Sequence, residues 1–253
     1  MGAQEPLPAL DAWLFDLDGV LTATSRIHAA CWKEMFDKFL EQRAKERGEP
    51  FVPFDAGDDY LRYVDGKPRA AGVRDFLASR GIEMPEGTPA DPASAETVNG
   101  LGNRKDRLVT AAIARGEVEV FPASVEFVRL LRRDGMRTAV VSSSRNTVAV
   151  LNAVGIADLF DVRVDGVVAA ERSLPGKPQP DTFLAAASDL GVAADRAAVV
   201  EDATAGVAAG RAGAFGLVVG VDRGAGHDAL LAAGADMVVG DLGELIPRLD
   251  PPA

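Results

Sequence analysis

Several features are scarce in this chain of 253 residues, and each scarcity excludes a class of protein. The single cysteine, Cys31, cannot form a disulfide within the chain, and its place beside Trp32 in a helical pattern is typical of a small core residue. No apolar stretch approaches the roughly 20 residues of a membrane span. The formal net charge of -11 argues against a nucleic-acid or anionic-membrane partner, because either would require a broad basic surface.

The first residues also lack the basic start and apolar stretch of a signal peptide, so we expect a cytoplasmic protein. With 47% hydrophobic and 26% charged residues, the composition is that of a globular protein of one large or two modest domains. The sequence leaves the oligomeric state open and is compatible with a monomer. His227 follows a glycine-containing turn at an expected helix start and is interpreted as a surface residue.

The most informative feature present is the tetrad Asp16-Leu17-Asp18-Gly19, directly after the apolar residues 13–15. An apolar run that ends in a glycine turn indicates a buried parallel strand, and open α/β sheets bind ligands at the carboxyl ends of such strands. Because side chains alternate along an extended backbone, Asp16 and Asp18 should face one pocket. The pair suits a divalent metal ion or acid/base chemistry, although a solvated aspartate–glycine turn has the same pattern.

The remainder of the chain alternates between two kinds of pattern. Residues 27–114 show helical periodicity without a run of buried strands, and their first helix should end near Gly48. From residue 120 onward, helices alternate with four apolar strand candidates, at 138–141, 197–200, 216–219 and 236–239. The sequence therefore predicts an α/β fold, with a doubly wound parallel-sheet core at 1–25 and 115–253 and an inserted helical cap at 26–114.

Polar residues follow two of these strands, and a lysine lies in a loop between the two. The run 142–146, which contains Ser142 and Ser143, comes after the second strand, where a hydroxyl and backbone N–H groups at a helix start can hold an anion, although Ser and Asn also cap helices. A second acidic pair, Glu201-Asp202, ends another strand and could add oxygen ligands for Mg²⁺. Prolines on both sides stiffen the loop around Lys177, although most loop lysines are merely solvated.

The order of these four elements resembles the motifs of the haloacid dehalogenase superfamily, and the resemblance covers nearly the whole chain. Within that superfamily, the opening residues 15–22 with Thr24, His28 and Trp32 are similar to those of β-phosphoglucomutases and related sugar-phosphate phosphatases. Residues 102–106, 120–122 and 201–206 are similar to the same subgroup. The resemblance implies a Rossmann-like core and phosphoryl transfer on a small sugar phosphate.

The resemblance also implies a role for each matching residue. Asp16 would be the nucleophile that becomes an aspartyl phosphate, and Asp18 the general acid/base. The other implied roles are phosphate binding by Ser142, Ser143 and Lys177, Mg²⁺ binding by Asp16, Asp18, Glu201 and Asp202, and contact with the substrate or the closing cap by Thr24, His28, Arg69 and Lys105.

The chain departs from the mutase subgroup at two positions, which leaves the acceptor open. Asp65 stands where a cap lysine is usual, with Lys67 two positions later, and Ala23 replaces an aspartate of the opening loop. Asp65 should repel an anionic group near Arg69, unless it is a solvated turn residue and Lys67 supplies the missing charge. A mutase that returns the phosphoryl group to the sugar is the leading hypothesis, and a phosphatase that transfers it to water is the alternative.

Two further hypotheses are less favoured. A hydrolytic dehalogenase would use the first aspartate, but it needs neither a metal nor the acid at Asp18. A non-catalytic sensor of sugar phosphates would be expected to have damaged catalytic residues, and all four motifs are intact.

Overall fold

The computed structural model describes residues 6–249, and the chain divides into two compact units. Unit 1 combines Met1–Ala23 with Glu119–Ala253, and unit 2 is Thr24–Val118. The expected boundaries at 26 and 114 followed the ends of helices, whereas unit 2 also takes in the turn before its first helix and the segment after its last. Among the described residues, no helix has both the length and the apolar character needed to cross a membrane.

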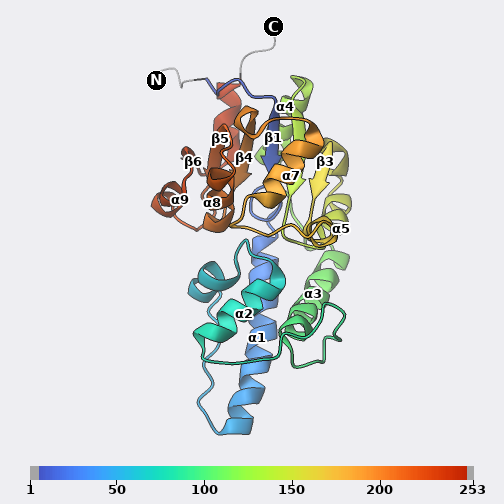
Figure 1. Ribbon diagram of the computed structural model, residues 1–253, viewed down its shortest axis with the longest axis vertical. Coiled ribbons are helices and arrows are strands. Elements are labelled where there is room, and N and C mark those ends of the chain that lie inside the picture. The colour runs from blue at the N-terminus through green and yellow to red at the C-terminus, as the bar shows by residue number, and fades with distance from the viewer. Residues whose placement is uncertain (1–5, 250–253) are drawn as a thin grey trace. The chain divides into compact units, whose positions relative to one another are not determined.

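Unit 1 is built on a parallel sheet of six strands in the order β3-β2-β1-β4-β5-β6 (Figure 1). This order confirms the predicted doubly wound core, in which the first strand lies at the centre. The strands are β1 (Ala12–Phe15), β2 (Arg137–Val141), β3 (Val162–Val164), β4 (Ala197–Glu201), β5 (Leu217–Val221) and β6 (Met237–Val239).

Helices cover both faces of this sheet, because successive side chains of the buried strands point to opposite faces. Leu14 and Val199 join a cluster with Phe183 on one face, beneath α7, α8 and α9. Trp13 packs edge-on against Phe127 of α4 on the other, with ring centroids 5.2 Å apart. The helices of unit 1 are α4 (Pro122–Arg133), α5 (Thr147–Ala153), α6 (Gly166–Glu171), α7 (Asp181–Leu190), α8 (Thr204–Ala212) and α9 (His227–Ala233), with short helical turns η2 (Ala157–Leu159), η3 (Ala194–Arg196) and η4 (Leu242–Arg248).

The edge strand β3 was missed by the sequence analysis. It has only three residues, and its central residue, Arg163, is exposed, so no apolar run identifies it. It matters for the site because the Val164 carbonyl accepts the backbone N–H of Ser142 at 3.0 Å. The edge strand therefore helps to fix the loop after β2.

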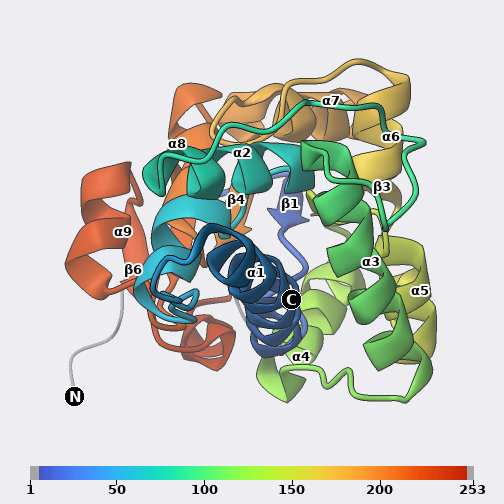
Figure 2. The same cartoon turned by 90° about the horizontal axis from the view of Figure 1, so that it is seen from below.

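Unit 2 is helical, as expected, and consists of α1 (Ser25–Arg47), the π-helical turn η1 (Tyr60–Val64), α2 (Arg69–Ser79) and α3 (Val98–Ala114). Figure 2 looks along α1, with α2 and α3 beside it. The core of unit 2 centres on Phe36, Phe54 and Phe76, whose ring centroids lie 4.1–5.2 Å apart. Gly48 ends α1 with a φ of 66°, a left-handed conformation that glycine adopts without a steric penalty. Unit 2 thus has an aromatic core of its own.

Candidate active site

Lys177 is the centre of a buried charged cluster at the carboxyl ends of three adjacent strands. Its ammonium group pairs with the carboxylate of Asp16 after β1 and lies 2.5 Å from Oε1 of Glu201 at the end of β4. It also donates to the carbonyl of Val141 at the end of β2, at 3.3 Å. Asp16, Lys177 and Glu201 are 7%, 3% and 0% exposed, so these interactions take place away from bulk water. One lysine therefore joins three strand ends.

The position of Lys177 follows from the elements around it. The loop that carries it leads into α7, and its Nζ lies 5.0 Å from the centroid of the Phe183 ring on that helix. An ammonium over an aromatic face gains a favourable electrostatic contact. The lysine is thus held by a ring below and by oxygen atoms from the strand ends.

Glu201 is held in place by backbone donors and by a glycine. Its Oε2 accepts hydrogen bonds from the backbone N–H groups of Asp202 and Ala203, both at 3.0 Å. A Cβ on Gly206, in the first turn of α8, would lie 1.8 Å from Oε1 of Glu201. Only glycine at 206 lets α8 begin directly against this carboxylate.

A second glycine makes room for Asp202. Gly19 has a φ of 90°, and a Cβ on it would lie 1.7 Å from Oδ2 of Asp202. Gly19 therefore adopts the left-handed conformation that the turn requires, and its missing side chain allows Asp202 to approach the loop after β1. This brings together the two acidic pairs that lie far apart in the sequence.

Asp16 and Lys177 shift each other's pKa. Burial raises the pKa of Asp16 well above its usual range, opposed by Lys177 and reinforced by the charges of Glu201 and Asp18. Burial disfavours the charged form of Lys177, but the carboxylates of Asp16 and Glu201 outweigh it and hold the pKa of the lysine above its usual value. The ammonium therefore stays charged and partly offsets the burial that favours the protonated form of Asp16.

The carboxylates of this cluster also fit a divalent metal ion. One oxygen from each of Asp16, Glu201 and Asp202 lies within 4.8 Å of the others. Hard cations such as Mg²⁺ prefer carboxylate oxygens and usually retain several water ligands, so a small set of protein oxygens suffices. The donor set is therefore of the type that the sequence analysis expected.

The serines expected to bind phosphate lie beside the cluster, in the loop that leads from β2 into α5. Ser142 directly follows β2 and is 3% exposed, and its Oγ accepts the backbone N–H of Ser144 at 3.1 Å. Ser143 is in the same loop, and α5 begins only at Thr147. The run 142–146 thus leads into the helix start, as expected: the serine hydrogen bonds close a turn, and Asn146 is the N-cap residue of α5.

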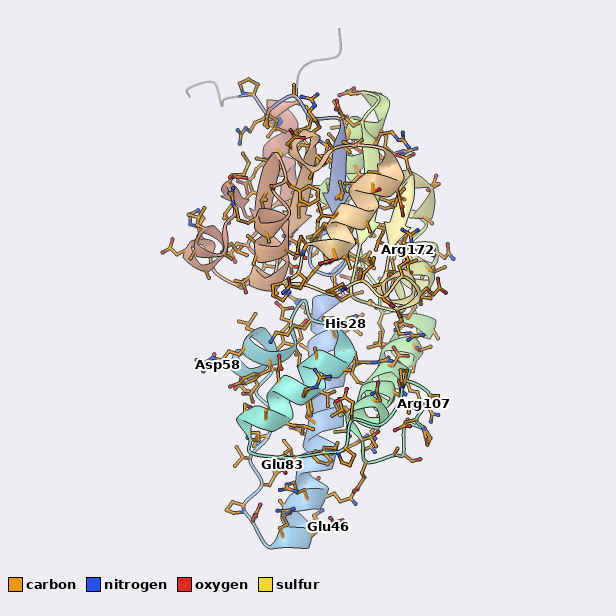
Figure 3. All side chains as sticks on the ribbon, in the orientation of Figure 1. His28, Glu46, Asp58, Glu83, Arg107 and Arg172 are labelled. Atoms are coloured by element: carbon orange, nitrogen blue, oxygen red, sulfur yellow. The ribbon has the colours of Figure 1, made fainter. Side chains whose placement is uncertain are left out.

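Unit 2 carries the other expected site residues in a separate cluster. Lys105 of α3 is 6% exposed, and its Nζ lies 2.6 Å from Nδ1 of His28 and 5.0 Å from the centroid of the Trp32 ring. Figure 3 labels His28 near the start of α1. Thr24 is buried and precedes the first turn of the same helix. Lys105 and His28, which the sequence places 77 positions apart, therefore form one polar cluster.

Arg69 is held by two residues of α3. Its guanidinium pairs with Asp106 at 2.7 Å and donates to Oδ1 of Asn103 at 2.8 Å. Lys67, the residue that could replace the usual cap lysine, instead pairs with Asp75 at 2.7 Å. Both cations of this segment thus have anionic partners within unit 2.

Two residues outside the acidic motifs were interpreted as structural or surface residues. Cys31 is 7% exposed, and burial raises the pKa of its thiol, so the interpretation as a core residue is confirmed. His227 is exposed at the start of α9, as expected. Arg223, which no sequence motif singled out, contacts the loop after β1, and its only sequence signal was a position just after an apolar strand.

Comparisons with known proteins agree with this geometry. The model of the haloacid dehalogenase-like hydrolase family matches residues 10–213. A β-phosphoglucomutase from Mycobacterium bovis is 52% identical over 93% of this chain and 91% of its own length, and one from Bacillus subtilis is 31% identical over 95% and 93%. A crystal structure of a family hydrolase from Deinococcus radiodurans with bound phosphate and sodium has a TM-score of 0.65 at 28% identity, covering 96% of this chain and 99% of that one.

Proposed function

The chain belongs to the haloacid dehalogenase-like hydrolase family and is a β-phosphoglucomutase-like enzyme of that family, and we propose that it transfers the phosphoryl group of a small sugar phosphate through Asp16. The observation that carries the proposal is the placement of Lys177 between Asp16 and Glu201, with Asp202 beside them. It combines a buried carboxylate with a fixed cation and a set of metal ligands at one edge of the sheet.

The proposed reaction has two displacements. A carboxylate oxygen of Asp16 attacks phosphorus, the bond from phosphorus to the sugar oxygen breaks, and Asp18 donates a proton to the departing oxygen. Asp18 then accepts the proton of the next hydroxyl, whose oxygen attacks the aspartyl phosphate and restores Asp16. The charge of Asp18 already acts on Asp16, which supports their placement at one reaction centre.

The remaining residues of the cluster neutralise charge. Lys177 would bind an oxygen of the transferring group, and Ser142 with Ser143 would donate hydrogen bonds to it. Asp16, the Asp18 carbonyl and Asp202 would hold Mg²⁺, with Glu201 supporting it through the metal's waters, and the ion when bound supplies positive charge to the phosphoryl oxygens. Glu201 would in addition hold Lys177, the partner that it has in the structure.

We propose that unit 2 is the cap of this enzyme. Arg69 and Lys105 would bind the distal end of the sugar phosphate, and His28 with Thr24 would couple closure to the position of Asp18. Closure would exclude water and so decide which acceptor reaches the aspartyl phosphate. The 52% identity to a mycobacterial β-phosphoglucomutase favours return of the phosphoryl group to the sugar.

A phosphatase of the same mechanism is the second candidate. It is favoured by Asp65 and Ala23, the two departures from the mutase pattern, and by the names of relatives such as the Deinococcus hydrolase. A sensor of sugar phosphates is disfavoured, because the charged cluster has the groups that turnover requires.

Incubation with β-glucose 1-phosphate, Mg²⁺ and a trace of the 1,6-bisphosphate tests the proposal. We expect glucose 6-phosphate to form without a matching release of inorganic phosphate. Release of phosphate without the 6-phosphate would exclude the mutase and support the phosphatase. Tight binding without either product would support the sensor.

The matched control is Asp16→Asn, which keeps the shape of the side chain and removes the nucleophile. We expect its turnover to fall by about 10³-fold or more with its fold intact. Turnover close to that of the native enzyme would remove Asp16 from this role.

A further inference from the structure

Arg223 ties the catalytic loop to the distant edge of the sheet, and we propose that it is a positioning residue for Asp18. It lies just after β5, which is separated from β1 by β4. Its Nε donates to the carbonyl of Gly19, the residue next to Asp18, at 3.1 Å. The inference rests on the proposed acid/base role of Asp18, and it concerns the geometry of the loop rather than contact with the substrate.

The guanidinium is itself fixed on its other sides. One Nη donates to the carbonyl of Gly240 at 3.0 Å and the other pairs with Asp241 at 3.1 Å, both just after β6. Its side chain is only 20% exposed. Each of the three guanidinium nitrogen atoms of Arg223 therefore has its own acceptor. An arginine can bind three separate acceptors in this geometry, and a lysine cannot.

Arg223 also contacts the loop after β1 indirectly, through Phe121. The guanidinium carbon lies 3.7 Å from the centroid of the Phe121 ring, and the backbone N–H of Phe121 donates to the carbonyl of Leu21 at 2.9 Å. Arg223 thus contacts one end of the turn directly, at Gly19, and the other end through Phe121. A planar cation stacked on an aromatic face keeps both its packing and its hydrogen bonds.

The turn has its own hydrogen bonds, and a bridge between Thr22 and Val120 holds its far end, but neither contact engages the Gly19 carbonyl. Thr22 and Leu21 donate to the carbonyl of Leu17, and Gly19 donates to the carbonyl of Thr22 at 2.8 Å. These bonds close the turn on itself. None of these hydrogen bonds within the turn uses the Gly19 carbonyl. Arg223 donates to this carbonyl, and so fixes the position of Gly19 relative to the strand ends. Loss of this contact should let Asp18 move while Asp16, at the end of β1, stays in place.

The test compares two phosphoryl donors that differ in their need for an acid. The sugar phosphate releases an alkoxide oxygen, which Asp18 must protonate, whereas acetyl phosphate releases a carboxylate, which needs no proton. Single-turnover formation of the phosphoenzyme is measured by acid quench for the native enzyme and for Arg223→Met. We expect the rate with the sugar phosphate to fall on the order of 10- to 100-fold and the rate with acetyl phosphate to change within about threefold.

Arg211 offers a matched control, because it also joins a glycine carbonyl to an aspartate. It donates to the carbonyl of Gly234 at 2.9 Å and pairs with Asp236, but both precede β6, at the opposite end of the sheet. Arg211→Met should leave both rates within about twofold. Arg223→Lys, which retains the charge and one donor, should recover part of the rate with the sugar phosphate.

The outcomes are distinct. Equal losses with both donors in Arg223→Met, or no loss with either, would overturn the inference, and the first result would mark Arg223 as purely structural. If Arg223→Met does not fold, Phe121→Leu removes the ring and retains the arginine, and should show the same selective loss at smaller size. If the native enzyme forms no phosphoenzyme from either donor, the proposed function fails instead.

Discussion

The two units hold their cations in different ways. In unit 1, Lys177 is 2% exposed at its side chain and is shared by two carboxylates from different strands. In unit 2, Arg69 and Lys67 each pair with one carboxylate on a helix and keep 22% and 23% of their side-chain surface exposed. A buried, shared cation is organised before any ligand arrives, whereas a partly solvated pair can exchange its partner for a ligand at little expense. The difference suits reaction chemistry in one unit and recognition in the other.

Replacement of Lys177 should produce the largest effect. Lys177→Met leaves Asp16 and Glu201 as buried carboxylates without their cation, so turnover should fall on the order of 10³-fold and the free energy of unfolding by about 3–5 kcal/mol. Steady-state kinetics and denaturant unfolding measure the two. Lys177→Arg retains the charge and should recover stability more than turnover.

Lys105→Met is the counterpart in unit 2. Lys105 contacts His28 and the ring of Trp32 within unit 2, so we expect KM to rise more than kcat falls. A loss of kcat as large as that of Lys177→Met, at unchanged KM, would contradict the division between the units.

A smaller effect is expected from Gly206→Ala, which disturbs the buried cluster through packing alone. The new Cβ would collide with the Glu201 carboxylate, which must move away from Lys177, and turnover should fall about 10²-fold. Gly210→Ala in the same helix is the control, because its Cβ would meet only the apolar side chains of Val199 and Val218, at 3.1 and 3.2 Å. Both changes favour the helix equally, so similar kinetics of the two variants would refute a role for the Glu201 position.

The smallest effect should come from Arg69 and Lys67, the two partly exposed cations of unit 2. If Arg69 leaves Asp106 to bind the distal end of the substrate, Arg69→Ala should raise KM about tenfold, the loss expected for one charge-assisted hydrogen bond. If Lys67 stays with Asp75 when the substrate binds, Lys67→Ala should change KM within about twofold. An equal rise in both variants would show instead that Lys67 supplies the charge missing at Asp65.

Much of the fold was predictable from local pattern. Apolar runs identified five of the strands, and the helical period of unit 2 identified its insertion after the first strand, because burial on both faces and amphipathic helices leave distinct periodicities. The three-residue strand β3 was missed, since a short edge strand with an exposed arginine has no such pattern. The helix start after β2 was expected within the run 142–146, and α5 begins directly after it, but the turn that the serines close first had no distinct pattern.

The sequence by itself determined which chemical groups this protein carries and in what order: carboxylates after two strands, serines after a third, and a lysine in a stiff loop. Only the tertiary structure decided which of them meet. Lys177 and Asp16 lie 161 positions apart, and the order of the strands brings them together with Glu201 around one ammonium group. The contact of Arg223 with Gly19, 204 positions away, left no trace in local pattern. Periodicity reports how each segment is buried, whereas contacts between segments depend on the order in which strands pair.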